Sequence, residues 1–166
     1  MDEPCPECGG EGRVVRAESL EITVPPGAED GTALRVPGHG LPGTEGGPPG
    51  DLYAVVRIAP DPRFERDGAD LWRTETISVP DAVLGTHVQV PTLEGKVEVT
   101  VPPGTQPDAV LRLRGKGLPR LGTGRRGDLN VRVELRVPEA PSSEERELYE
   151  RLRKVRRPDG RPRRAS

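Results

Sequence analysis

The sequence contains an internal duplication. Residues 22–52 align without gaps to residues 99–129 at a constant offset of 77, and 15 of the 31 aligned positions are identical. The motifs VPPG, LR, GxGLP and GDL all align at this same offset, so chance similarity between proline-rich turns does not explain the identities. A chain with this pattern is expected to fold into two related units.

Each copy has the pattern of short strands separated by turns. An alternating apolar run places side chains on one face of a strand, and Pro-Pro-Gly then ends it because proline cannot donate to a ladder. A short strand, a glycine-rich loop and a long alternating strand follow. In the first copy the apolar run is Leu20, Ile22 and Val24, the short strand is 33–36, the loop is 38–50 and the long strand is 51–59. In the second copy the apolar run is Val97, Val99 and Val101, the short strand is 110–113, the loop is 115–127 and the long strand is 128–137. Because neither loop joins a strand to a helix, we interpret its glycines as turn residues and not as a phosphate cradle.

The second copy has an opening part that the first copy lacks. Residues 71–79 and 86–90 predict two further strands around a small connector at 81–85. Subtracting the offset of 77 from residue 70 gives a position before residue 1, and a segment with two cysteines takes that place in the first copy. We therefore expect a complete second unit and a partial first unit, whose exposed apolar face or unpaired strand edge needs a partner.

The composition favours an all-β fold. Glycine and proline make up about a quarter of the 166 residues and aromatic residues only 2%, so frequent turns separate strands whose core must consist of Val, Leu and Ile. No stretch has the length of a membrane span, the N-terminus lacks a secretory signal pattern, and two cysteines do not make a disulfide scaffold. We expect a cytoplasmic protein.

Residues 142–157 have the only clear helical pattern in the sequence. Ser142 and Glu145 have the spacing of a capping box, and Leu148, Leu152 and Val155 form a narrow apolar stripe. This stripe either packs on the second unit or makes a dimer contact. Residues 151–166 carry eight basic groups and one acidic group, which we interpret as a solvated tail; non-specific contact with nucleic acid is the alternative.

Several motifs together resemble the DnaJ family of co-chaperones. Residues 5–12, CPECGGEG, fit the repeated zinc motif C-x-x-C-x-G-x-G of that family. Further blocks that resemble the family's C-terminal domains follow in order as far as residue 138. They are VPPGAEDGTALRVPGHG (24–40), PGDLYAVV (49–56), RFERDGADL (63–71), DAVLGT (81–86), VPTLEG (90–95) and GTQPDAVLRLRGKGLP (104–119).

The resemblance implies two tandem β-sandwich-like domains, the first of them incomplete here, and a short C-terminal helix that forms a homodimer. The corresponding boundaries are 1–12 for a remnant of the zinc module, 13–63 and 64–138 for the two β domains, and 139–166 for the helix and tail. It also implies a chaperone module for protein folding and the stress response, which binds unfolded polypeptide and works with a DnaK-type heat-shock ATPase.

The sequence departs from the family in three respects. The ATPase-stimulating J-domain carries a His-Pro-Asp triplet, whereas His39 and His87 of this chain are followed by other residues, and a Gly/Phe-rich linker is also absent. Complete members carry four zinc motifs and this chain carries one. We expect a module that lacks J-domain activity.

The resemblance assigns client binding to an apolar groove of the first domain. The positions that match its lining are Leu20 and Ala54, and Ile22 and Val56 lie on the same strand faces. An extended peptide would pair its backbone with a strand edge there and bury alternate side chains. The alternative is that all four residues belong to an ordinary core.

Cys5 and Cys8 are the candidate metal ligands. Structural zinc needs four ligands, and a single CxxC supplies two, so we expect an orphaned half-site that binds metal weakly at most. Zinc shared with a second CxxC, and a redox pair, remain alternatives; the glycines at 9, 10 and 12 argue against the helix that a thioredoxin-like pair requires.

No residue pattern indicates catalysis, because the acidic residues are scattered and the histidines and serines have no partner motif. We therefore predict that the chain is not an enzyme. A polypeptide-binding chaperone module is the leading function, and the alternatives are a nucleic-acid-binding β protein that uses the basic tail and a zinc or redox protein.

Overall fold

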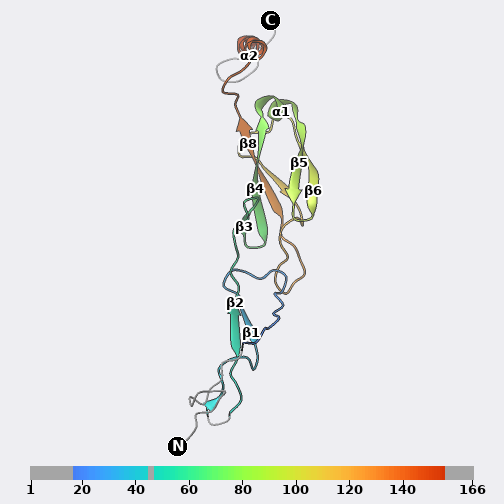
Figure 1. Cartoon of the computed structure of the whole chain (residues 1–166). Coiled ribbons are helices and arrows are strands. Elements are labelled where there is room, and N and C mark those ends of the chain that lie inside the picture. Colours follow the sequence, from blue (N-terminus) through green and yellow to red (C-terminus); the bar gives the residue numbers. More distant parts are fainter. Residues whose placement is uncertain (1–16, 45–46, 156–166) are drawn as a thin grey trace, which may run out of the picture. The chain divides into compact units, whose positions relative to one another are not determined.

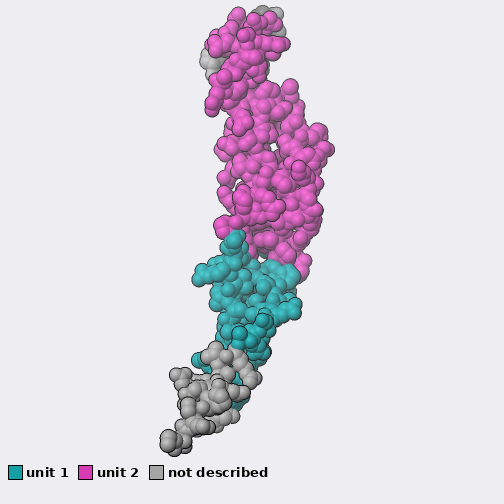
Figure 2. Space-filling model, in the orientation of Figure 1, with its two compact units in different colours: residues 1–59, 120–123 teal, residues 60–119, 124–166 magenta. Residues whose placement is uncertain are grey.

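The computed structural model describes residues 17–44 and 47–155 (Figure 1). Within these ranges the chain forms eight β-strands and two α-helices, which confirms the predicted all-β class with a C-terminal helix. The chain divides into two compact units, coloured separately in Figure 2. Unit 1 contains residues 1–59 and 120–123, and unit 2 contains residues 60–119 and 124–166.

Unit 2 contains two sheets. In the larger one the order is β3 (Glu65–Asp67), β4 (Asp70–Ser78), β8 (Leu129–Arg136) and β7 (Val110–Leu113). β4 and β8 run parallel and pair along eight residues, whereas the other neighbours are antiparallel. The smaller sheet is the antiparallel hairpin of β5 (Thr86–Thr92) and β6 (Gly95–Val101).

The core of unit 2 lies between these sheets. Alternate residues of β8, namely Leu129, Val131 and Val133, are buried, and Val90 of β5 and Val101 of β6 are buried with them. Since successive side chains of a strand point to opposite faces, one face of each strand meets the core and the other meets solvent. The core consists mainly of Val and Leu, as the low aromatic content requires.

The predicted connector after β4 is a short helix, α1 (Val79–Leu84). Ser78 is its N-cap, because the Ser78 hydroxyl accepts a hydrogen bond from the Asp81 amide at 3.2 Å. The helix ends at Gly85, which has φ 85° and leaves little room for a side chain beside Pro103. The expected connector at 81–85 therefore lies mostly within helical structure.

Close packing accounts for two glycines of the glycine-rich loop in unit 2. A Cβ atom on Gly117 or Gly127 would lie 2.6 or 2.2 Å from the carbonyl oxygen of Ala69, closer than van der Waals contact permits. The Leu118 amide donates to the same oxygen at 2.8 Å and fixes the loop there. These contacts agree with the interpretation of the glycines as backbone elements.

The described part of unit 1 contains one antiparallel pair, β1 (Ala33–Val36) and β2 (Leu52–Val55). The prediction of a strand at Leu20, Ile22 and Val24 is wrong, because residues 17–25 have no regular secondary structure. In unit 2 the equivalent strand β6 pairs with β5, and the counterpart of β5 would be residues 9–15, outside the described residues. Without a described neighbour, this segment has no ladder to complete.

The predicted strand at residues 51–59 is also longer than the observed β2. Its counterpart β8 pairs with β4 over its whole length, and the described part of unit 1 holds no equivalent of β4. One antiparallel neighbour, β1, then determines how far the ladder extends.

The C-terminal helix α2 spans Ser143–Val155. The predicted capping box is confirmed: the Glu145 amide donates to the Ser142 hydroxyl at 3.2 Å, and the Ser142 amide donates to the Glu145 carboxylate at 2.7 Å. Neither helix in the described part of the chain has the length and apolar character needed to span a membrane.

Candidate functional site

The apolar face of unit 1 is exposed at positions whose duplicates are buried. The Leu52 side chain of β2 is 37% exposed, whereas its counterpart Leu129 is fully buried. Val24 is 53% exposed and its counterpart Val101 is 1% exposed. The residue types agree between the copies, so the difference arises from the strands that cover this face in unit 2. Unit 1 has apolar surface of core type that no described strand covers.

The same comparison identifies an open strand edge on β2. The Val56 amide donates to the Thr32 carbonyl at 2.9 Å, and the Val56 carbonyl accepts from the Gly31 amide at 2.8 Å. Backbone groups of an antiparallel strand point alternately to its two sides. The amides of Tyr53 and Val55 therefore point away from β1, along the edge where β8 carries β4. In the described part of unit 1, no strand occupies this edge.

The predicted client-binding residues all lie in unit 1 and are half-buried. Ala54 lies opposite Leu34 in the β1–β2 register, and Val56 follows β2 on the same face. Leu20 and Ile22 lie in the segment without secondary structure, so the structure does not place them in the same sheet as Ala54.

Sequence reasoning missed two residues of this face, Leu52 and Leu34. The duplication held the signal, because the positions 77 residues later are Leu129 and Leu111, which belong to the core of unit 2 or pack against it. A residue of unit 1 can thus be assigned to the apolar face when the residue 77 positions later is buried in unit 2.

A carboxylate at the start of β2 orders the turn after β1. The Asp51 carboxylate accepts from the Gly38 amide at 3.1 Å and from the Arg35 guanidinium at 2.5 Å. These donors, the Gly38 amide first, lower the pKa of Asp51 below its ordinary value. The contacts of Asp51 fix the start of the glycine-rich loop beside the exposed face.

Unit 2 has a second apolar surface at its helical end. Leu148, Leu152 and Val155 of α2 are 50–60% exposed, so the stripe does not pack on the rest of unit 2 in this structure. Tyr149 is instead the half-buried residue of the helix, and it lines a groove of about 520 Å³ with Val79 and Val137. The stripe is available to another surface.

Cys5 and Cys8 lie outside the described residues, so the predicted half-site has no structural description. In residues 17–44 and 47–155, no group of three or more His, Cys, Asp or Glu side chains is arranged to hold a metal ion. The part of the tail beyond Val155 also lies outside the description.

Comparison with known proteins decides the family. The model of the DnaJ C terminal domain matches residues 8–138, which include both copies of the duplication. The chain belongs to the DnaJ C-terminal domain family. The match ends before α2, so the helix with the exposed stripe follows the region that defines the family.

Individual DnaJ proteins are similar over nearly the whole chain. "Chaperone protein DnaJ" of Thermosynechococcus vestitus is 43% identical over 157 residues, which cover 94% of this chain and 42% of that protein. The protein of the same name from a Synechococcus strain is 45% identical over 159 residues (92% and 40%), and that of Haloarcula marismortui is 47% identical over 151 residues (91% and 39%). The chain thus spans about two fifths of the length of these curated relatives.

Proposed function

We propose that this DnaJ C-terminal chain is a chaperone module that binds unfolded polypeptide through unit 1. The observation that carries the proposal is the exposure of the β1–β2 face at positions whose duplicates form a core. Relatives named as chaperone proteins support the same functional class.

The geometry suits an extended polypeptide. A segment lying along β2 would exchange main-chain hydrogen bonds with Tyr53 and Val55, which any sequence can do. Alternate side chains of the segment would contact the face made by Leu52, Ala54 and Val56. Binding of this kind selects apolar character at every second residue and not a particular sequence, as a chaperone of unfolded clients requires.

Two variants separate this face from apolar exposure in general. Leu52→Asp places a charge on the proposed face, and Leu93→Asp places the same charge on a residue of unit 2 with similar exposure, 40% against 37%. We expect Leu52→Asp to lower the ability of the chain to delay aggregation of a chemically denatured protein by several-fold. The Leu93→Asp variant should behave like the unmodified chain in the same light-scattering assay.

A third variant tests the strand edge itself. Val55→Pro removes an amide that points away from β1, so the β1–β2 hydrogen bonds remain and only the open edge changes. Loss of holding activity is expected. Equal activity of the Leu52→Asp, Leu93→Asp and Val55→Pro variants would place client binding elsewhere and contradict the proposal.

We further propose that the exposed stripe of α2 is the contact of a homodimer. Burial of the stripe against a second copy would account for leucines on an otherwise charged helix, and two-fold symmetry would use each leucine twice. Dimerisation would place two polypeptide-binding faces on one particle and raise its avidity for a long client.

A further inference from the structure

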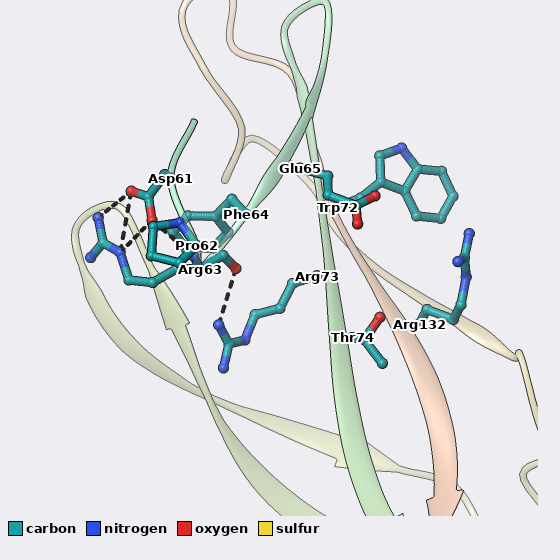
Figure 3. A pocket seen from close by; sticks show the side chains of 9 residues that line it. All are labelled: Asp61, Pro62, Arg63, Phe64, Glu65, Trp72, Arg73, Thr74 and Arg132. Carbon is teal, nitrogen blue, oxygen red and sulfur yellow. Dashed lines mark hydrogen bonds and ion pairs between the residues drawn. The ribbon is translucent and has the colours of Figure 1, made fainter. Parts of the chain in front are cut away.

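Unit 2 contains a polar cavity of about 480 Å³ beside β4 (Figure 3). Its lining comes from β3 and the segment before it, from β4 and from β8. The residues are Asp61, Pro62, Arg63, Phe64, Glu65, Trp72, Arg73, Thr74 and Arg132. This volume is in the range that proteins use for small ligands and short peptide segments.

Two of the three arginines of this cavity have acidic partners. Arg63 binds Asp61 through its guanidinium at 2.7 Å, and Arg73 binds Glu75 at 2.5 Å. Arg73 also donates to the Arg63 carbonyl at 3.1 Å. These contacts fix the segment before β3 against β4 and leave little charge for a ligand.

Arg132 differs from the other two. Its guanidinium carbon lies 5.4 Å from the ring centre of Trp72, and within the described residues it forms no ion pair. A cation–π contact of this kind holds the guanidinium near the ring without using its N–H donors. Such a group is suited to a carboxylate, which it can bind with two parallel hydrogen bonds.

The cavity also follows the part of β4 that β3 does not pair. β3 pairs with β4 only as far as Trp72. The Leu71 amide donates to the Asp128 carbonyl, toward β8, so by alternation the backbone groups of Thr74 point to the opposite side, beyond the end of β3. In Figure 3, Arg63 and Arg73 lie on one side of β4, and Trp72 with Arg132 on the other.

We propose that this cavity is a second peptide site, which binds an extended acidic segment. The backbone of the segment pairs with β4 at Thr74, and a Glu or Asp side chain binds Arg132 where it stacks on Trp72. The positive charge of Arg132 selects the acidic occupant. Glu65, an exposed carboxylate in the same lining, limits the affinity because it repels the incoming charge. This site lies in unit 2 and does not rest on the proposed function of unit 1.

Trp72 is the only tryptophan of the chain, so its fluorescence reports on the cavity directly. The probe is the peptide N-acetyl-Leu-Glu-Leu-Glu-Leu-amide, titrated into the full chain up to roughly 1 mM, the range of weak peptide binding. We expect a saturable change in Trp72 emission. The matched peptide with Gln in place of Glu should give no such change, and neither should acetate at the same concentration.

Substitutions then test the assigned roles, with affinity measured by calorimetry so that altered emission does not interfere. Arg132→Gln should weaken binding roughly tenfold or more, the expected loss of a charge-assisted bidentate contact. Arg136→Gln, on the same face of β8 but outside the cavity, should leave it unchanged. Glu65→Gln should strengthen it, because a like charge is removed.

Circular dichroism of each variant establishes that the fold is retained. Absence of saturable binding to the unmodified chain, or equal affinity for the Glu and Gln peptides, would overturn the proposal. Equal losses in Arg132→Gln and Arg136→Gln would show attraction by net charge and would also overturn it. Binding of acetate alone with the same affinity would reduce the cavity to a simple anion site and reject the peptide.

Discussion

At the scale of single residues, the two copies preserve one electrostatic contact. Asp128 repeats the geometry of Asp51: its carboxylate accepts from the Gly115 amide at 2.8 Å and from the Arg112 guanidinium at 2.6 Å. The amide first and then the guanidinium lower the pKa of Asp128 below its ordinary value. The folded state therefore favours the ionised carboxylate more strongly than the unfolded chain does.

The pH dependence of stability follows from the sign of this shift. A lowered pKa contributes stability that is fully present above the unfolded value, roughly 3.9, and is lost as the pH falls through the folded value. We predict that Asp128→Asn lowers the melting temperature at pH 7 by a few degrees and by clearly less near pH 3.

Thermal melts followed by circular dichroism check this prediction. Asp67→Asn, which removes an exposed carboxylate of β3, serves as the control and should melt like the unmodified chain at pH 7. A difference between Asp128→Asn and the unmodified chain that is the same at both pH values would show that the contact is not electrostatic.

At the scale of elements, the sequence predicts those features whose causes are local. The bounds of β1 and β7 agree with the prediction, and the Ser142–Glu145 capping box is present, because turn residues and cap spacing act within a few positions. The helix α1 was missed although Ser78 and Asp81 carry a cap spacing. The helix is so short that its residue pattern does not differ from that of a connector.

The strand expected at residues 20–24 is not observed, and the counterpart of its neighbour in unit 2 lies outside the described residues. Its alternation equals that of β6, but β6 exists because β5 supplies its ladder. Alternation determines which face a strand would bury and says nothing about whether a neighbour is present. The candidate site has the same limit: Ala54 was identified through the resemblance to the DnaJ family, whereas the exposure of Leu52 required the structure.

The stripe of α2 yields a prediction at this scale. Full burial of a leucine side chain contributes roughly 1.5–3 kcal/mol, and a symmetric contact would bury Leu148 and Leu152 from both copies. We predict that the unmodified chain sediments as a dimer and that Leu148→Asp with Leu152→Asp sediments as a monomer. Arg151→Asp, the same new residue on the charged face, should remain dimeric; a monomeric unmodified chain would refute the proposed contact.

At the scale of the whole molecule, we expect client holding to be separable from stimulation of an ATPase. Neither His39 nor His87 begins a His-Pro-Asp triplet. We predict that the purified chain delays aggregation of a denatured protein and yet leaves the ATP hydrolysis rate of a DnaK-type chaperone at its basal value. Steady-state hydrolysis, with a complete DnaJ protein as the positive control, checks this. Stimulation by the chain alone would contradict it.

The uncovered face of unit 1 also determines what a calorimeter detects. The heat capacity of unfolding increases with the apolar area that becomes hydrated, and the face around Leu52 is already partly hydrated in the folded chain. We therefore expect unfolding of unit 1 to contribute less to the heat-capacity increase than unfolding of unit 2. A polypeptide that covers the face removes that water and lowers the heat capacity of the complex. The temperature dependence of the binding enthalpy thus measures how much of the face a client covers.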